Sequence, residues 1–328
     1  MERDAKRRVL CLLTGGIMYK FIIRRILIAI PTIFAVMILV FTILNFLPGD
    51  PGRIILGAEA TKEMVDMFNA EFGLDQPYII RLGSFLSGVI TRFDFGVSYR
   101  TRQPVIEELI YRLPITARIS AFSVILAILV GIPLGVLAAV KRSTITDASL
   151  TVLAMFLTAI PTFVFALMLV FVFALRLGWL PTFGAQTLRH YILPVMTLGI
   201  LSSGGFIRFT RVIMLETVNQ EYIKTARAKG AAEPRVIWKH AFKNACLPLI
   251  NSTMLMFSSL LGGAIITETI FSINGIGLTI LRAVQNRDMP VVTAGSIVLA
   301  TFFLSIVILI DLFYAFIDPK IRARFSSS

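Results

Sequence analysis

The chain is poor in the residues that build metal centres and disulfide frameworks. Its 328 residues include two cysteines, Cys11 and Cys246, and two histidines, His190 and His240. Two cysteines are too few for a disulfide framework or a cysteine cage around zinc. No carboxylate lies at ligand spacing from either histidine. We therefore expect no metal site and no cofactor.

Sequence patterns for catalysis are also missing. There is no G-x-x-x-x-G-K-[ST] phosphate loop, so ATP is not expected to bind by that route. Paired carboxylates, a Ser–His–Asp order and zinc motifs are absent as well, which argues against a hydrolase. The segment LSSGG, residues 201–205, superficially resembles the signature of ABC ATPases, but it lies in an apolar stretch and is interpreted as a helix-packing feature. No catalytic residue is predicted, and the chain is not expected to be an enzyme.

Apolar residues, by contrast, are abundant. Hydrophobic residues make up 56% of the chain and charged residues 16%, and the mean hydropathy is +0.83. Such a composition points to a membrane protein with several spans. A bilayer crossing needs about 20 apolar residues in a helix. Six stretches are long enough, near residues 21–47, 115–140, 149–175, 190–214, 248–271 and 290–317. The predicted fold class is an all-α membrane protein with six transmembrane helices.

The surplus of basic residues predicts the orientation. The formal net charge is +13, and in a soluble domain it would suggest a nucleic-acid partner. Here the basic residues cluster beside apolar stretches, so we expect no nucleic acid and interpret the charge by the positive-inside rule. The N-terminus, the second-to-third connection, the fourth-to-fifth connection and the C-terminus are basic. Both termini are therefore predicted to lie in the cytoplasm.

The segment Asn219–Ile250 is the longest polar interval in the second half of the chain. Tyr222–Lys229 is rich in helix formers, Gly230 is suited to a left-handed helix end, and Glu233 with Pro234 can start a second helix. A basic loop of this kind could lie on anionic lipid headgroups. Alternatively, small side chains keep the first helix slim enough to enter a groove on a partner.

The sequence of this loop resembles a known family. YIKTARAKG, followed by His240 and NACLP, resembles the cytoplasmic "EAA" loop of ABC importer permeases, in the variant of the peptide/nickel family and its dipeptide/oligopeptide "B"-type subunit. Thr225 stands where the general motif has Glu. The resemblance implies a coupling helix that enters a cleft on an ATPase subunit. The implied ATPase-coupling residues are Tyr222, Thr225, Ala226, Arg227, Ala228, Lys229, Gly230, Leu247 and Pro248.

The resemblance runs over nearly the whole chain from Met18, and relatives begin like MYKFIIRRILIAIPT, so Met18 is a candidate start. We expect a polar extension at 1–17, a first transmembrane helix at 18–47, an extracytoplasmic loop at 48–112, a permease core of five helices at 113–318 with the coupling loop at 219–250, and a cytoplasmic tail at 319–328. The long loop either covers the helix ends or, as its FGLDQP and DFGVSYRTRQPV motifs imply, faces a binding protein.

A second motif, TETIFSINGIGLTIL, follows the fifth apolar stretch. Glu268 is an acid at the predicted outer membrane edge, where ionisable residues are functional candidates by default. The family pattern has a proline where Asn274 stands, while Gly275 and Gly277 still allow a tight turn. We predict a re-entrant or outer gate segment with Glu268, Phe271, Gly275 and Gly277.

These inferences predict an inner-membrane permease subunit of a binding-protein-dependent ABC importer for di- or oligopeptides. Nickel, glutathione or another small solute is the alternative within this class, and a stand-alone secondary transporter or an integral-membrane enzyme is the alternative outside it. The resemblance implies a homologous second permease as heterodimer partner, two cytoplasmic ATPase subunits and an extracytoplasmic substrate-binding protein. Membrane lipid surrounds the spans.

Overall fold

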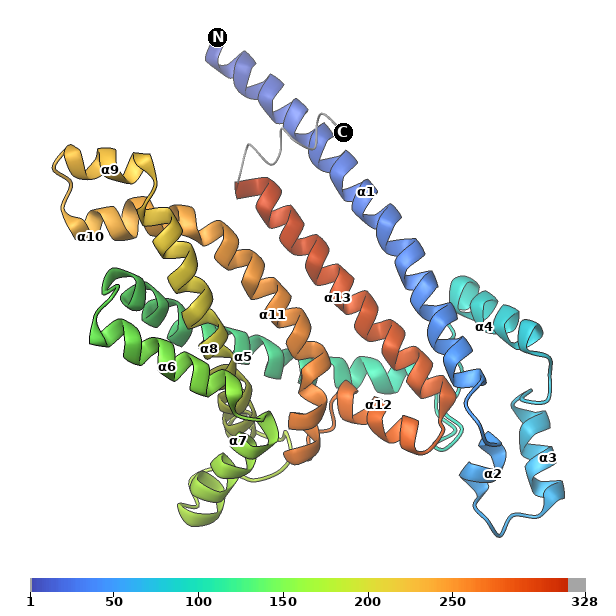
Figure 1. The fold of residues 1–328 in the computed structure, drawn as a ribbon. Helices are drawn as coiled ribbons and strands as arrows, with labels where there is room; N and C mark the ends of the chain where they lie inside the picture. The colour runs from blue at the N-terminus through green and yellow to red at the C-terminus, as the bar shows by residue number, and fades with distance from the viewer. Residues whose placement is uncertain (1, 318–328) are drawn as a thin grey trace. The chain divides into compact units, whose positions relative to one another are not determined.

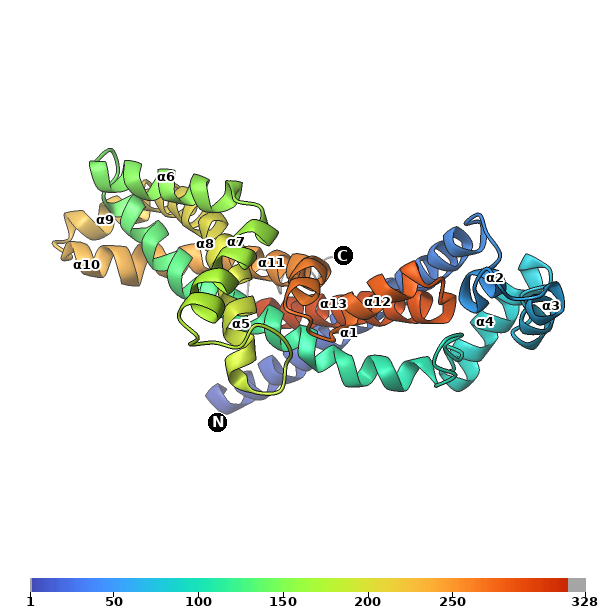
Figure 2. The same cartoon turned by 90° about the horizontal axis from the view of Figure 1, so that it is seen from below.

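A computed structural model describes the backbone of residues 2–317 and the side chains of residues 23–310 apart from Gly263. The described chain is helical and contains no strand, only an isolated bridge between Val97 and Pro104. It divides into two compact units (Figures 1 and 2). One unit comprises Met1–Ile110 with Ile280–Ser328, and the other comprises Tyr111–Thr279. The predicted tail at 319–328 lies outside the described residues.

The first unit begins with α1 (Glu2–Asn45), so the expected extension at 1–17 continues into the first span as one helix. The 48–112 connection holds three short helices, α2 (Pro51–Leu56), α3 (Lys62–Glu71) and α4 (Tyr78–Arg92). The last helix, α13 (Met289–Ile317), packs along α1. Asp318 and Pro319, a motif that resembles the end of family members, lie outside the described residues.

The second unit is built around α8 (Leu188–Val218), which packs against helices that precede and follow it in the sequence. Of the preceding helices, it contacts α5 (Val105–Val140), α6 (Ile145–Ala159) and α7 (Thr162–Leu169), and α7 continues into the π-helix η1 (Val170–Arg176). After α8 come α9 (Glu221–Ala228), α10 (Glu233–Arg235), the π-helix η2 (Val236–Phe242), α11 (Lys243–Ile270) and α12 (Ile276–Gln285).

Glycines allow the close approach of these helices. A Cβ added at Gly131 would lie 2.4 Å from the Cβ of Phe206, and one at Gly135 would lie 2.5 Å from that of Thr210. A Cβ at Gly204 would lie 2.7 Å from the carbonyl oxygen of Ala154. No real side chain tolerates these distances, so α5 and α6 meet α8 only because the residues there are glycines.

Five described helices are long and apolar enough to cross a membrane, or six if one bent pair counts as a single span. The bent pair is α6 with α7 and η1, which meet at an angle of 96°. Proline disfavours the helical conformation of the residue before it, and Ile160, before Pro161, is extended with ψ 124°. The third span predicted at 149–175 is therefore broken at Pro161.

Candidate functional site

The predicted coupling loop forms a helix, a glycine turn and a second helix, as expected. Gly230 has φ 79°, and the amide of Ala231 donates to the carbonyl of Ala226 at 3.2 Å, which closes the turn. The second helix starts with Glu233 and Pro234 and continues through η2 into α11 without a break. The turn is therefore attached rigidly to a long apolar helix.

One side of α9 anchors it to the second unit. Ile223 is fully buried in a cluster that includes Met214 of α8, Val236 of η2 and Leu249 of α11. Burial of an isoleucine side chain contributes about 1.5–3 kcal/mol. This single residue fixes the rotation of α9, an eight-residue helix too short to be stable by itself.

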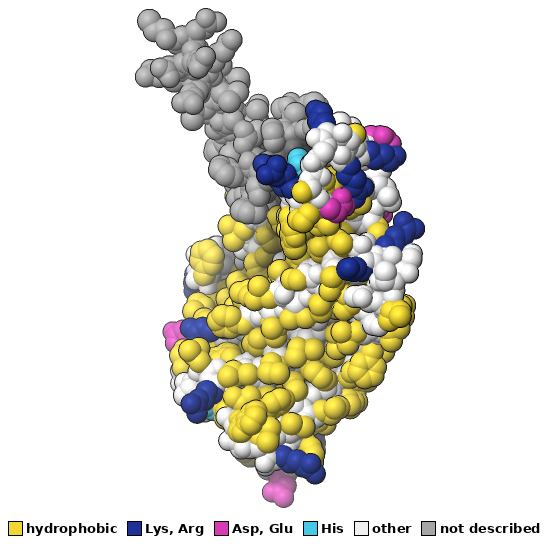
Figure 3. Space-filling view, turned by 90° about the vertical axis from the view of Figure 1, so that its left-hand side faces the viewer, with side chains coloured by type: hydrophobic (Ala, Val, Ile, Leu, Met, Phe, Trp, Pro, Cys, Tyr) yellow, Lys and Arg dark blue, Asp and Glu magenta, His cyan; other side chains and the backbone are white. Residues whose placement is uncertain are grey.

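The opposite side of α9 is open. Tyr222, Thr225, Ala226 and Lys229 follow the i, i+3, i+4, i+7 spacing of one helix face, and all but the half-buried Ala226 are exposed. Lys and Arg side chains gather over α9 and α10 above a broad hydrophobic surface (Figure 3). The arrangement presents a narrow helix with a basic rim, which suits docking into a groove on a partner.

Not every predicted coupling residue belongs to this face. Arg227 turns toward Glu233, with hydrogen bonds of 3.1 Å from Nε and 2.6 Å from Nη2. Leu247 and Pro248 lie inside α11, where both are half-buried. These two residues belong to the support of the coupling loop and not to its exposed surface.

The predicted gate residues form a compact polar node at the end of α11. The Glu268 carboxylate is fully buried and accepts hydrogen bonds from Thr116 Oγ1 at 2.6 Å and from the amide of Leu278 at 2.7 Å. Thr116 Oγ1 in turn accepts from the amide of Ile276 at 2.9 Å. A buried carboxylate needs such partners, and here they tie α5, α11 and α12 together.

Gly275 and Gly277 were expected to allow the tight turn after α11, and the structure corrects this role. Neither Gly275 nor Gly277 has a positive φ, and the left-handed residue of the turn is Ser272, with φ 47°. A Cβ at Gly275 would lie 2.2 Å from Glu268 Oε1, and one at Gly277 would lie 2.7 Å from Ile265 Cγ1. Both glycines serve close approach to α11. Phe271 is buried, and its carbonyl accepts from the amide of Gly184 at 3.0 Å.

In the first unit, α3 ends before Gly73, as predicted, and buries Val65 and Phe68. Phe68, Phe72 and Tyr99 form an aromatic cluster, and the Arg102 guanidinium lies 4.7 Å from the Phe72 ring centroid. Asp288, between α12 and α13, accepts from Ser98 Oγ at 2.5 Å and from the amide of Tyr99 at 3.1 Å. The loop is therefore fastened to the start of α13.

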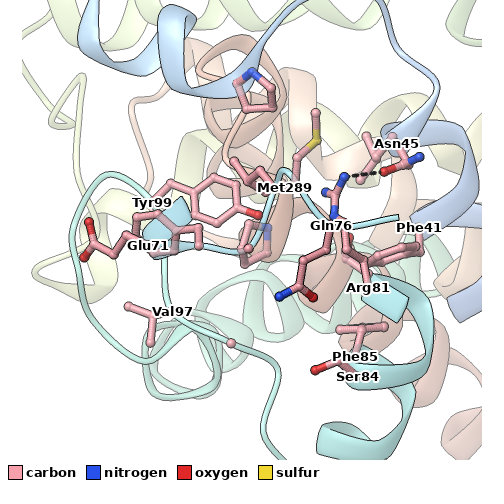
Figure 4. A pocket seen from close by; sticks show the side chains of 18 of the residues that line it. Phe41, Asn45, Glu71, Gln76, Arg81, Ser84, Phe85, Val97, Tyr99 and Met289 are labelled. Carbon is pink, nitrogen blue, oxygen red and sulfur yellow. Dashed lines mark hydrogen bonds between the residues drawn. The ribbon is translucent and has the colours of Figure 1, made fainter. Parts of the chain in front are cut away.

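A pocket of about 500 Å³ opens in the first unit (Figure 4). Arg81 donates to Asn45 Oδ1 at 2.7 Å on its wall, beside the stacked rings of Phe41 and Phe85. Burial raises the pKa of Tyr99 to about 12, with Arg81 opposing the shift and Asp288 adding to it. The Tyr99 hydroxyl therefore stays a hydrogen-bond donor at neutral pH.

Sequence reasoning missed the residues that support these sites. Ile223, Thr116 and Asp288 are ordinary residues in their segments, and nothing in their spacing singles them out. A partly buried ion pair was missed as well: Asp147 Oδ1 and Oδ2 accept from Arg211 Nε at 2.5 Å and Nη2 at 2.8 Å, and the pair joins the start of α6 to α8. For Asp147 and Arg211 the only signal in the sequence is a charge near the end of an apolar stretch.

Two family models match the chain. Residues 131–323 match the family described as "Binding-protein-dependent transport system inner membrane component", and residues 18–120 match the N-terminal model of the same kind of transport component.

Among the described residues, no group of three or more His, Cys, Asp or Glu side chains could hold a metal ion.

Curated relatives agree with these family matches. The proteins named "Glutathione transport system permease protein GsiC" from Escherichia coli strain K12 and Shigella dysenteriae serotype 1 are each 37% identical over 307 residues, which is 94% of this chain and 100% of theirs. An inward-facing structure of the MetNI methionine ABC transporter covers 62% of this chain and 95% of its own, with 18% identity and a TM-score of 0.49. By its family matches and its curated relatives, the chain belongs to the inner-membrane permeases of binding-protein-dependent ABC importers, within the peptide/nickel family.

Proposed function

We propose that this subunit moves peptide-like solutes, either short peptides or glutathione, across the inner membrane by alternating access driven by ATPase subunits. The open face of α9 is the observation that carries the coupling part of this proposal. Tyr222, Thr225, Ala226 and Lys229 are presented on a helix that Ile223 holds to the spans. A force applied to α9 would pass through η2 directly into α11, so closure of the ATPases can move a span.

A substitution on the open face tests the docking. Ala226→Trp adds a bulky ring to the narrow helix and should reduce co-purification of the ATPase and abolish transport, while the subunit still inserts and folds. Ile145→Trp is the matched control, because Ile145 is 86% exposed at the start of α6, next to another connection that is also predicted to be cytoplasmic. If Ala226→Trp binds the ATPase and transports normally, α9 does not dock, and the alternative of a lipid-bound loop is favoured.

The loop 48–112 is proposed to receive the substrate-binding protein on the outer side, with both termini in the cytoplasm. The outer face of α3 carries Met64 and Met67, which are 47% and 66% exposed while Val65 and Phe68 are buried. Methionines adapt to partner surfaces, so this face suits docking. Replacing both with Lys should raise the binding-protein concentration needed for half-maximal ATPase stimulation and leave basal ATPase activity unchanged.

The remaining partner is proposed to be a homologous second permease, which would complete the translocation path as a heterodimer. Selectivity is proposed to reside in the binding protein, because desolvated charges without partners cost several kcal/mol and a mostly apolar path cannot grip a zwitterion tightly. Peptide-selective binding at micromolar affinity or tighter, measured on the permease without its binding protein, would refute this division of labour.

The relatives are named for glutathione, which makes glutathione and short peptides the two leading substrates. Purification of the complex with its binding protein, followed by mass spectrometry of the co-purified ligand, decides between them. Uptake into proteoliposomes tests the class: transport that needs ATP inside and no ion gradient supports the importer, and transport that follows a gradient without ATP supports a secondary transporter.

A further inference from the structure

The helix α8 exposes one narrow stripe near its middle and second half. Gly205, Arg208 and Val212 follow each other at spacings of three and four residues, and all three are exposed while most residues around them are buried. Ser202, one turn before Gly205, is half-buried on the same side. The most enclosed span of the second unit therefore has a single open side in this region.

A groove of about 560 Å³ lies over this stripe. Thr158 at the end of α6 and Ser252 and Met256 on α11 form its walls, and Ser202 and Arg208 line it from α8. A Cβ added at Gly205 would meet no atom within 4 Å, so the absence of a side chain there leaves open space and is not needed for packing. This glycine differs in that respect from its neighbour Gly204, which packs against α6.

The polar groups of the groove suit an anion. Arg208, Ser202 and Ser252 offer a guanidinium and two hydroxyls as donors, and no Asp or Glu is among the lining residues. None of these three side chains has a hydrogen bond to a protein group of the described chain in residues 23–310, so their donors are available. A guanidinium binds a carboxylate through two parallel hydrogen bonds.

The depth of Arg208 argues against a lipid-facing role. It lies six residues before the inner end predicted for this span, at residue 214, and ten before the Val218 end of α8, which is about 9 Å and about 15 Å along a helix. An arginine that far inside a span is costly beside lipid chains, and such residues usually face a water-filled cavity or the interior of a bundle. The rest of the lining is mixed: Leu201, Phe206, Phe209, Val212 and Met256 are apolar, and Ser202, Ser252 and Thr158 carry hydroxyl groups.

We propose that this groove is part of the translocation path and that Arg208 binds a carboxylate of the passing substrate. The proposal rests on the function proposed above and adds the chemical group that the subunit recognises. A single cation on an open groove binds weakly, which suits a site that must release its ligand. For a peptide the group is the C-terminal carboxylate, and for glutathione it is either carboxylate.

Paired ligands test this assignment in the reconstituted complex with its binding protein. Transport of one short peptide is measured as the free acid and as the C-terminal amide, in the unaltered complex and in Arg208→Gln. The amide lacks the negative charge, so the loss should fall on the acid alone, at about tenfold. Comparing variant with unaltered complex for each ligand cancels any preference of the binding protein. Arg208→Lys should restore part of the acid transport.

Arg189→Gln is the matched control, because Arg189 is an exposed arginine on the same helix that does not line the groove. It should leave both ligands unaffected. Equal transport by Arg208→Gln and the unaltered complex, or an equal loss for acid and amide, would overturn the assignment. If the unaltered complex transports neither ligand, the peptide function fails instead, so the two failures are distinguishable.

Discussion

The guanidinium of Arg227 and the carboxylate of Glu233 close the turn between α9 and α10 from its two sides. Their two hydrogen bonds, 2.6 Å and 3.1 Å long, span the left-handed Gly230. The side chains are 39% and 52% exposed, so solvent screens the pair and its contribution to stability is small, about 0–1 kcal/mol. Its geometry instead fixes the angle at which α9 leaves the rest of the loop.

Glu233→Gln should therefore change coupling and leave stability almost unchanged. We expect normal thermal inactivation, since Ile223 still anchors α9, but weaker stimulation of ATPase activity by loaded binding protein, because the angle between α9 and α10 is then less firmly fixed. Glu221→Gln is the matched control: Glu221 also pairs with a basic residue of α9, Lys224 at 2.8 Å, but does not bridge the turn. Equal coupling in the two variants would contradict the bracing role.

The left-handed conformation of Gly230 gives a second prediction. No atom would lie within 4 Å of an added Cβ, so Gly230→Ala adds only backbone strain, about 1–2 kcal/mol. Gly178→Ala provides a control with the same strain elsewhere, because Gly178 has φ 64° and equally open surroundings. Both variants should inactivate at lower temperature, and only Gly230→Ala should reduce transport per complex. Equal transport in both would show that the turn has no special role.

The substitution Gly275→Ala tests the polar node around Glu268. A methyl group there would overlap Glu268 Oε1, and the carboxylate cannot move without losing Thr116 and Leu278 as donors. We expect Gly275→Ala to destabilise the complex by about 1–3 kcal/mol, the usual cost of overpacking. Gly262→Ala, inside α11, meets no atom within 4 Å and should be neutral or slightly stabilising. Thermal inactivation of the purified complex measures both.

Much of the fold follows from the sequence because apolar length and helix punctuation are local properties. The apolar runs, the end of α3 before Gly73 and the turn at Gly230 all lie within a few residues of the signals that predict them. The bend at Pro161 was missed, since proline inside a span is tolerated in some helices and breaks others. Which occurs depends on the neighbouring helices.

The candidate sites were predicted only in part, for a related reason. The sequence marks Glu268 and Gly275 as unusual, but Glu268 is satisfied by Thr116, which lies 152 residues away. In the same way Asp288 meets Ser98 across 190 residues. Partners so distant leave no trace in local spacing, and the open groove beside Arg208 is likewise visible only once α6, α8 and α11 are placed together.

The orientation of the membrane spans can be tested with single cysteines in a variant that lacks Cys11 and Cys246. Lys62→Cys and Lys229→Cys both lie at exposed positions, so accessibility of the side chain does not separate them. An impermeant thiol reagent applied to intact cells should label Lys62→Cys and should label Lys229→Cys only after permeabilisation. The reverse pattern would invert the orientation proposed from the basic residues.

Asp288 should control how firmly the loop 48–112 is held. Its buried carboxylate accepts from Ser98 Oγ and the Tyr99 amide. Asp288→Asn keeps the size of the side chain, but one of its two terminal atoms becomes a donor. That donor faces either the Tyr99 amide, which is itself a donor, or Ser98 Oγ, which already accepts from the amides of Arg100 and Thr101, so one of the two bonds is lost or weakened. A buried group left unsatisfied costs about 1–3 kcal/mol. That is enough to open the loop more often without unfolding the spans, because local openings draw on only a few contacts.

We therefore expect Asp288→Asn to be cleaved faster within residues 48–112 by a protease added from outside and to need more binding protein for half-maximal ATPase stimulation. Asp75→Asn serves as the control, since Asp75 is an exposed carboxylate of the same loop. Faster cleavage with unchanged dependence on binding protein would separate the two effects: Asp288 would then hold the loop, and the docking surface proposed for α3 would lie elsewhere. Unchanged cleavage would show that the contacts at Asp288 do not limit opening of the loop.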